Sequence, residues 1–564
     1  MSRYKFTPFL FVFLSILIFL FGISQKLNVP LTEWDWVSLS AGENWSNGIN
    51  SAWLFDHPPL YPAFLALVFR IFGVSVSVAR LANVFCILVT ALVIYKLAYQ
   101  LSNRWAGLWA VVFYLLSPLS IQGITAIDLA DSSLLPLGFI ALFYFINRTY
   151  SSPGILNIAL VGITVALCLW AKVTSTLGLL LGVLSYPLIN HHGLSHAWAK
   201  AAIGSILGIC MFLITWASIS IPLWGMDSFS LLLVTPLSSF AVRLANGGLL
   251  PRLLSLGLDS LRIIFWFSPF FIYLYLWKTV LIWKMRKEKK LGALGLLTWS
   301  SLFYSLGYLV IGGTNWGFPR YHAAILPLLA ILVGILVQPI IEKLTKKEGL
   351  ILLGAMFSLW LTYLLLVNDP LLFFNLKWKG ALLFGSEPFS LIEEGILQVV
   401  LLLGLPLLIC PVFVTIFGNR GVKESILLTL CVASFATIFF VDFKQMYATY
   451  NTFYQYGAQE KEEVVKMVSR HVKAGELVLT TPEFVYEFRD KDAPQVLWKV
   501  WRSPGTIYKS IEEMKPKAII AGLTTHTFEQ LQWIFHNPTI QLELNQHYNM
   551  YKIGTYFVWI RKYI

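Results

Sequence analysis

Residues 55–81 read FDHPPLYPAFLALVFRIFGVSVSVARL, and this stretch decides the fold. Two prolines precede an apolar segment from Leu60 to Phe72, which is too short to cross a bilayer because a spanning helix needs about 20 residues. Proline is favoured at the start of a helix, and aromatic side chains suit the membrane interface. We therefore predict a helix that lies in the interface at residues 60–72, followed by a spanning helix that begins at about residue 77.

The composition of the whole chain is that of a membrane protein. Of its 564 residues, 57% are hydrophobic and 13% are charged, and the mean hydropathy is +0.70. Soluble domains carry about a quarter charged residues, so this chain has too little polar surface for a water-soluble globule. The net charge of +13 would suggest nucleic acid in a soluble protein. Here the cytoplasmic loops account for it, and we expect no nucleic-acid partner.

Apolar runs predict about thirteen spanning helices. They lie near residues 7–25, 77–100, 105–120, 132–147, 155–171, 173–190, 201–220, 262–282, 292–311, 323–341, 349–367, 392–416 and 424–441. With the N-terminus in the cytoplasm, every inner loop of this arrangement is basic, as the positive-inside rule requires. The sequence therefore predicts a multi-pass protein of the plasma (inner) membrane, with its C-terminal end outside the cytoplasm.

The chain changes character after about residue 442. Charge rises, and helical patterns at 458–472, 508–514 and 527–534 alternate with strand patterns at 476–481, 517–521 and 554–560. We expect an all-α polytopic membrane domain over residues 1–442, which includes a first outer loop at 26–76. A small α/β extracytoplasmic domain would follow over residues 443–564.

The first outer loop carries the most informative polar residue, Asp35, which stands between Trp34 and Trp36 near the end of the first span. A long loop without a linker composition is usually functional. A carboxylate that is partly desolvated at the interface can serve as a general base. The alternative is an ordinary interfacial acid or a helix cap.

Other outer polar residues would face the same cavity. Asp128 and Asp131 precede the fourth span, where acids also serve as helix caps. Lys172 lies between two spans and either faces a polar cavity or extends to the interface. Arg320 opens the tenth span, and its guanidinium suits a phosphate or a lipid headgroup. Arg243 lies in a long outer segment against the positive-inside trend, which suits either an anionic ligand or headgroups.

The order of these motifs resembles the GT-C fold glycosyltransferases, in the branch of protein O-mannosyltransferases and aminoarabinose transferase (ArnT)-like enzymes, related to glycosyltransferase family 39. The resemblance covers roughly residues 30–330. The motifs that carry it are Asp35, Asp56-His57-Pro58-Pro59-Leu60-Tyr61, Phe72-Gly73, Ala79-Arg80-Leu81, Asp131, Lys172 and Arg320-Tyr321 with Leu326-Pro327. The chain departs from the family at Trp36, which replaces a second acid, and at His57, which replaces a lysine.

The resemblance implies transfer of one sugar from a polyprenyl-phosphate donor to a lipid, glycan or protein acceptor, with inversion at the anomeric carbon. Asp35 would deprotonate or orient the acceptor hydroxyl. His57, Lys172, Arg320, Tyr321 and Arg243 are the implied donor or phosphate-binding residues. The further acids of the site are Asp56, Asp128 and Asp131. No cofactor is required by this pattern, and a divalent metal stays open because Asp56 matches a position that can contribute to a metal site.

Two other readings remain open. A transporter or flippase of lipid-linked sugars would place charges near the middle of the bilayer, whereas here the polar residues gather at one face. A polysaccharide polymerase or ligase would share the lipid-linked substrate and use different residues.

Overall fold

The computed structural model describes most of the chain. The described residues are 6–27, 29, 31, 35–49, 58–127, 133–152, 154–189, 196–226, isolated positions from 253 to 263, 267–284, 292–311, 320–367, 389–418, 421–447, 450–451, 456–481, 484–488, 495–496, 504–522, 533–554 and 556–562.

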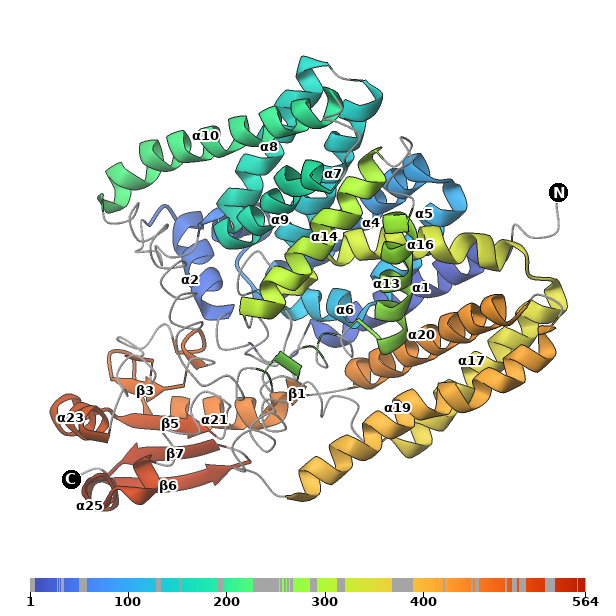
Figure 1. Ribbon diagram of the computed structural model, residues 1–564. Coiled ribbons are helices and arrows are strands. Elements are labelled where there is room, and N and C mark those ends of the chain that lie inside the picture. Colours follow the sequence, from blue (N-terminus) through green and yellow to red (C-terminus); the bar gives the residue numbers. More distant parts are fainter. Residues whose placement is uncertain are drawn as a thin grey trace.

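The chain before residue 448 forms helices that pack into one body (Figure 1). They are α1 (Phe6–Lys26), α2 (Asp35–Ser46), α3 (Leu60–Phe72), α4 (Val76–Leu101), α5 (Arg104–Leu115), α6 (Pro118–Thr125), α7 (Leu134–Ser151), α8 (Ile155–Ala171), α9 (Val173–Ser185), α10 (His196–Trp224), α13 (Pro269–Lys284), α14 (Gly292–Ile311), α15 (Arg320–Ala323), α16 (Leu326–Glu342), α17 (Lys346–Leu366), α19 (Phe389–Ile416) and α20 (Val422–Tyr447).

By length and composition, five of the described helices can cross a membrane, or six if the bent pair α5–α6 is one span. Shorter apolar helices lie at several of the other predicted spans, among them α8, α9, α13 and α16. The multi-pass helical fold is therefore confirmed, and the number of crossings stays a prediction.

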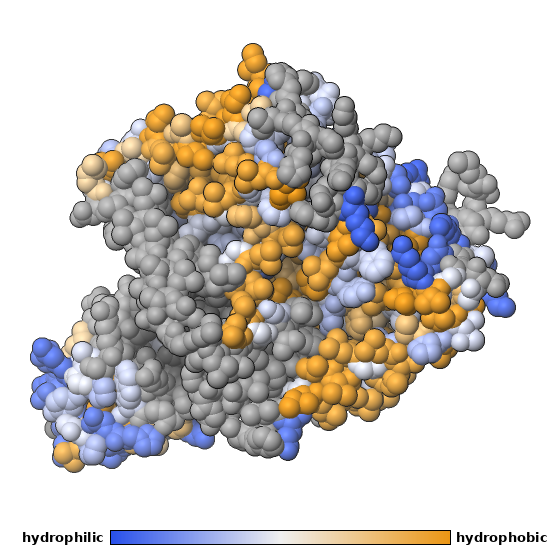
Figure 2. All heavy atoms as spheres, in the orientation of Figure 1, coloured by the Kyte–Doolittle hydropathy of each residue, from blue (hydrophilic) through white to orange (hydrophobic). Residues whose placement is uncertain are grey.

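Large apolar side chains remain exposed along the outer helices. Figure 2 shows them as orange surface over α10 and over α17 and α19. They include Ile206 and Ile214 of α10 and Leu407 and Leu408 of α19. Contiguous exposed apolar surface marks a partner or a membrane, so these faces fit contact with lipid.

Local sequence signals explain where several helices begin. The helix predicted at 60–72 is α3, which follows Pro59 and ends at Gly73. The Asn103 side chain accepts hydrogen bonds from two backbone N–H groups of α5 and so caps it. The predicted span at 105–120 is interrupted, because Pro118 lacks an N–H and starts a new helix, α6, which is bent by 54° from α5.

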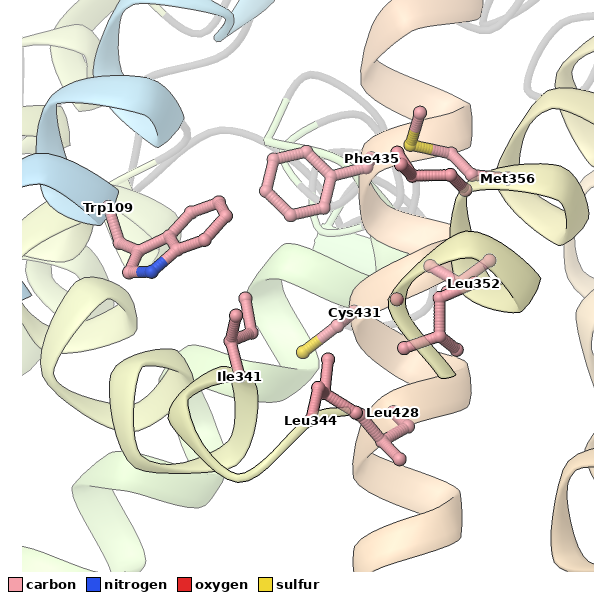
Figure 3. Close-up of a pocket in the computed structure, with 11 residues that line it drawn as sticks. Trp109, Ile341, Leu344, Leu352, Met356, Leu428, Cys431 and Phe435 are labelled. Atoms are coloured by element: carbon pink, nitrogen blue, oxygen red, sulfur yellow. The ribbon is translucent and has the colours of Figure 1, made fainter. Parts of the chain in front are cut away.

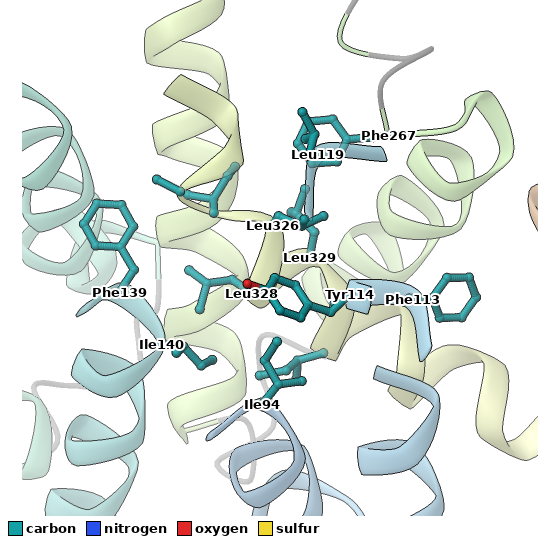
Figure 4. Packing of buried hydrophobic residues seen from close by; sticks show 14 of the residues in the cluster. Ile94, Phe113, Tyr114, Leu119, Phe139, Ile140, Phe267, Leu326, Leu328 and Leu329 are labelled. Atoms are coloured by element: carbon teal, nitrogen blue, oxygen red, sulfur yellow. The ribbon is translucent and has the colours of Figure 1, made fainter. Parts of the chain in front are cut away.

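A closely packed core surrounds α5 and α16. Figure 4 shows side chains of this core from several helices, among them Tyr114 of α5 and Leu328 of α16. The approach of the two helices depends on Gly334, where a Cβ would lie 2.6 Å from the Ala106 carbonyl oxygen and 2.7 Å from the Ala110 nitrogen. Backbone atoms cannot move aside as a flexible side chain can, so this contact requires glycine.

The C-terminal residues form a five-stranded mixed sheet, in the order β4-β3-β5-β7-β6. Its strands are β3 (Val478–Thr480), β4 (Gln495–Val496), β5 (Ala518–Gly522), β6 (Tyr548–Ile553) and β7 (Tyr556–Arg561). The pairs β4–β3 and β3–β5 are parallel, whereas β5–β7 and β7–β6 are antiparallel. The described helices beside the sheet are α21 (Ala458–His471), α23 (Pro504–Met514) and α25 (Pro538–His547). A short antiparallel pair, β1 (Tyr450–Asn451) with β2 (Tyr456–Gly457), precedes them.

The α/β class predicted for these residues is confirmed, and α21, β3, α23, β5 and β7 lie at the predicted places. The sequence did not predict α25 and β6. The helix predicted at 527–534 falls almost entirely outside the described residues.

We predict that Gly334→Ala forces α5 and α16 apart and destabilises the protein by about 1–3 kcal/mol, the usual cost of overpacking. Thermal unfolding in detergent measures the effect. The matched control is Gly354→Ala in α17, where an added Cβ would meet nothing within 4 Å. Equal midpoints for the two variants would contradict the packing argument.

Candidate active site

The buried carboxylate of Asp35 marks one side of the candidate site. Asp35 is the first residue of α2, a helix that packs on α3 and that the sequence did not predict. Its side chain is 0% exposed, and its Oδ1 accepts a hydrogen bond of 3.0 Å from the backbone N–H of Ile127. Ile127 follows the end of α6, so the carboxylate lies against the backbone that leads directly to Asp128.

A second side chain binds the other side of the same peptide group, which joins Ala126 to Ile127. The Tyr61 hydroxyl donates to Asn83 Oδ1 at 2.8 Å, and Asn83 Nδ2 donates to the Ala126 carbonyl at 2.8 Å. Tyr61 and Asn83 are buried and belong to α3 and α4. The proline-rich motif therefore reaches the same turn of backbone as Asp35. Sequence reasoning missed Asn83, although an amide within an apolar spanning helix is itself a signal of a specific role.

Arg80, from the Ala79-Arg80-Leu81 motif, fixes the end of the first helix. Its Nη1 donates to the carbonyls of Lys26 and Leu27 at 3.1 and 2.6 Å. The last carbonyls of a helix have no partner within the helix, and a cation also suits the negative end of its dipole. Arg80 thus acts as a buried cap of α1, which determines where the chain leaves that helix towards Asp35.

Lys172 provides the cation on the other side of the site. It is the one-residue joint between α8 and α9, with an extended backbone, and its side chain is 7% exposed. The ammonium lies 4.1 Å from the centroid of the Tyr321 ring, a cation–π contact. The structure therefore brings Lys172 and Tyr321 together, and their sharing of a ligand cavity stays a prediction.

The helix α6 connects the two sides. All eight of its residues are buried. The short helix α15, which carries Tyr321, packs against α6, and the backbone after α6 binds Asp35. Asp35 thus contacts the backbone after α6, and the ring beneath the Lys172 ammonium lies on α15, which packs against α6.

Several predicted site residues lie outside the described residues. They are Asp56, His57, Asp128, Asp131 and Arg243. Arg320 begins α15, but only its backbone is described. Two of these residues are next in the chain to a described residue: His57 precedes Pro58, and Asp128 follows Ile127. Among the described residues, no group of three or more His, Cys, Asp or Glu could hold a metal ion, so the possible metal at Asp56 stays a hypothesis.

An open groove of about 440 Å³ lies beside Trp170. Its walls come from α2, α3, α8 and α10, and its lining residues are Trp45, Gly48, Ile49, Pro59, Leu60, Ala63, Trp170, Ile219 and Leu223. Trp170 is two residues before Lys172, and its indole N–H donates to Thr215 Oγ1 at 2.9 Å. The groove is apolar, so it suits a hydrocarbon chain.

A smaller cavity has a different character. It measures about 70 Å³ and lies among α5, α16, α17 and α20, where Figure 3 shows Trp109, Ile341, Cys431 and Phe435 around it. No charged side chain lines it, so it is a packing void and no candidate for an anionic ligand.

One part of the chain matches a known protein family. Residues 56–216 match the family model described as dolichyl-phosphate-mannose-protein mannosyltransferase. No curated protein matches the chain.

Two solved structures resemble the chain over almost its whole length. ArnT from Cupriavidus metallidurans bound to undecaprenyl phosphate has a TM-score of 0.57 at 13% identity, over 98% of this chain and 97% of that one. The apo state of the same protein gives a TM-score of 0.55 at 13% identity, over the same shares of the two chains. The chain therefore has the fold of this ArnT, the GT-C fold, and part of it matches the mannosyltransferase family model.

Proposed function

We propose that the protein is an integral membrane glycosyltransferase that moves a sugar from a polyprenyl-phosphate donor to a hydroxyl of a lipid, glycan or protein acceptor, with inversion. The observation that carries the proposal is a buried carboxylate, Asp35, against the backbone after α6, together with a buried cation, Lys172, on the Tyr321 ring of α15, a helix that packs against α6. The fold and the family match of residues 56–216 support it.

The proposed chemistry assigns one role to each group. Asp35 takes the proton of the acceptor hydroxyl as the acceptor oxygen attacks the anomeric carbon. The bond from that carbon to the phosphate oxygen breaks, and the polyprenyl phosphate leaves with the electron pair. The Lys172 ammonium stabilises the charge that grows on the phosphate, which is usually the largest contribution to catalysis. The N–H of Ile127 orients the carboxylate, because a backbone N–H can only donate.

The groove beside Trp170 suits the isoprenoid tail of the donor. The tail would lie between α3 and α10, and the phosphate would remain near Lys172. Arg320, His57 and Arg243 are proposed to add positive charge around the phosphate, and Asp56, Asp128 and Asp131 to contact the sugar or the acceptor.

The C-terminal domain is proposed to begin at about residue 443 and to lie with the site on the extracytoplasmic side of the inner membrane. Tyr486, which follows β3, is 4% exposed and belongs to the same buried cluster as the membrane helices. This contact ties the domain to the membrane body and supports a role in choosing the acceptor.

A transfer assay tests the function directly. Radiolabelled polyprenyl-phosphate sugars are supplied to membranes that contain the protein, and the labelled product is identified. Transfer should occur in vesicles whose outer leaflet corresponds to the extracytoplasmic face. Absence of any transfer with a range of such donors would argue for the flippase alternative, which moves the lipid without forming a product.

We predict that Asp35→Asn lowers transfer by about 10²–10⁴-fold, the usual contribution of a general base. The amide keeps an oxygen that can accept the Ile127 N–H, so the variant should fold and insert into the membrane. Glu43→Gln, at a half-buried acid of the same helix α2, is the control and should retain activity. Equal activities of the two variants would remove Asp35 from the mechanism.

We further predict that Ala63→Trp, which fills the groove, weakens binding of undecaprenyl phosphate on the order of tenfold, because part of the tail loses its apolar contacts. The control is Leu67→Trp on the same helix, at a residue that is 59% exposed and does not line the groove. Binding by native mass spectrometry compares them. If Leu67→Trp has the same effect, the tail lies elsewhere.

A further inference from the structure

Tyr308 of α14 contacts Tyr321 directly and also contacts two residues that closely follow Lys172 in the chain. Its ring stacks on the Tyr321 ring, with centroids 5.1 Å apart and an interplanar angle of 18°. Its hydroxyl shares a hydrogen bond of 2.7 Å with Ser175 Oγ and donates to Thr174 Oγ1 at 3.3 Å. Thr174 and Ser175 belong to the first turn of α9, which begins directly after Lys172.

The backbone at Lys172 is also held. Its N–H donates to the Cys168 carbonyl at 2.8 Å, and its carbonyl accepts from the N–H and the hydroxyl of Thr176 at 3.2 and 2.7 Å. Four rotatable bonds separate this fixed backbone from the ammonium, so the backbone alone leaves the charge free to move. The cation–π contact with the Tyr321 ring is one contact that restrains the ammonium.

Two tyrosines of α14 contact Tyr321, one at its ring and one at its backbone carbonyl. Tyr308 stacks on its ring, and the Tyr304 hydroxyl donates to its carbonyl at 2.6 Å. Tyr304 and Tyr308 are one turn apart on the same helix face and are 1% and 5% exposed. Two hydroxyls of α14 thus tie together α9, which follows Lys172, and α15, which carries Tyr321.

We propose that Tyr308 is a positioning residue that fixes the Lys172 ammonium, by stacking on Tyr321 and by hydrogen bonding to the start of α9. The part of this inference that concerns phosphate binding rests on the proposed function. The part that concerns the position of the ammonium is independent of the proposed function. The two parts are tested by separate measurements.

The first measurement is the rate at which an amine-reactive ester labels Lys172, followed by peptide mass spectrometry and normalised to the exposed Lys343. Tyr308→Phe removes the hydroxyl and keeps the ring. It should raise Lys172 labelling on the order of fivefold to tenfold, since buried hydrogen bonds between α14 and α9 are lost. Tyr275→Phe is the matched control, because its buried hydroxyl pairs with Ser301 on α14 at 3.2 Å, and none of the ring contacts described for this part of the chain joins Tyr275 to Tyr308 or Tyr321.

A second variant separates positioning from general loosening. Ser175→Ala removes the other partner of the same hydrogen bond, so it should raise labelling as Tyr308→Phe does, and the double variant should exceed neither by more than about twofold. Labelling unchanged in Tyr308→Phe, or raised equally in Tyr275→Phe, overturns the inference.

The second measurement is the affinity for undecaprenyl phosphate in the full-length protein. Weaker binding in Tyr308→Phe on the order of fivefold, with Tyr275→Phe unchanged, supports both the positioning role and the phosphate role of Lys172. Raised labelling with unchanged lipid affinity keeps the positioning role and contradicts the phosphate role. The two measurements therefore distinguish a failure of the positioning role of Tyr308 from a failure of the phosphate role of Lys172.

Discussion

Where the backbone leaves a helix inside an apolar body, its N–H and C=O groups must find hydrogen-bond partners. The structure of the site depends on the partners of the backbone that follows α6. In lipid or in a dry protein core, each unpaired peptide group costs several kcal/mol. The break at Pro118 and the end of α6 at Thr125 create such groups. Asn83 supplies the donor for the Ala126 carbonyl, and Asp35 supplies the acceptor for the Ile127 N–H. The residues that satisfy the backbone are therefore also the residues that shape the site.

The sequence predicted those elements whose pattern is strong and local. The helix at 60–72 has prolines before it and a glycine after it, and α3 has these bounds. In contrast, the sequence DWVSLSAGENWS of α2 mixes polar and apolar residues without a clear period, so its helix was missed. The break between α5 and α6 was missed as well, because the apolar run continues through Ser117 and Pro118 and hydropathy does not register a change of direction.

At the site, the sequence indicated which polar residues matter, but it did not indicate which residues contact one another. An acid between two tryptophans and a lysine between two spans were recognisable from the sequence, and the structure buries both. The contacts that position them join residues far apart in the chain. Tyr61 and Asn83 are 22 positions apart, Asp35 and Ile127 are 92 apart, and Ser175 and Tyr308 are 133 apart. Such pairs depend on how helices pack, which no local period records.

The wall of the groove formed by Ile219 and Leu223 belongs to α10, a long apolar helix at the edge of the body, several of whose side chains, among them Ile206 and Ile214, are exposed. Under the proposed function, a prenyl chain that entered past this helix would arrive sideways, from within one leaflet. Its supply is then governed by its mole fraction among neighbouring lipids and by diffusion in two dimensions, and no aqueous concentration describes it. Turnover would accordingly respond to dilution of the donor with bulk phospholipid, even when the ratio of donor to protein is kept constant.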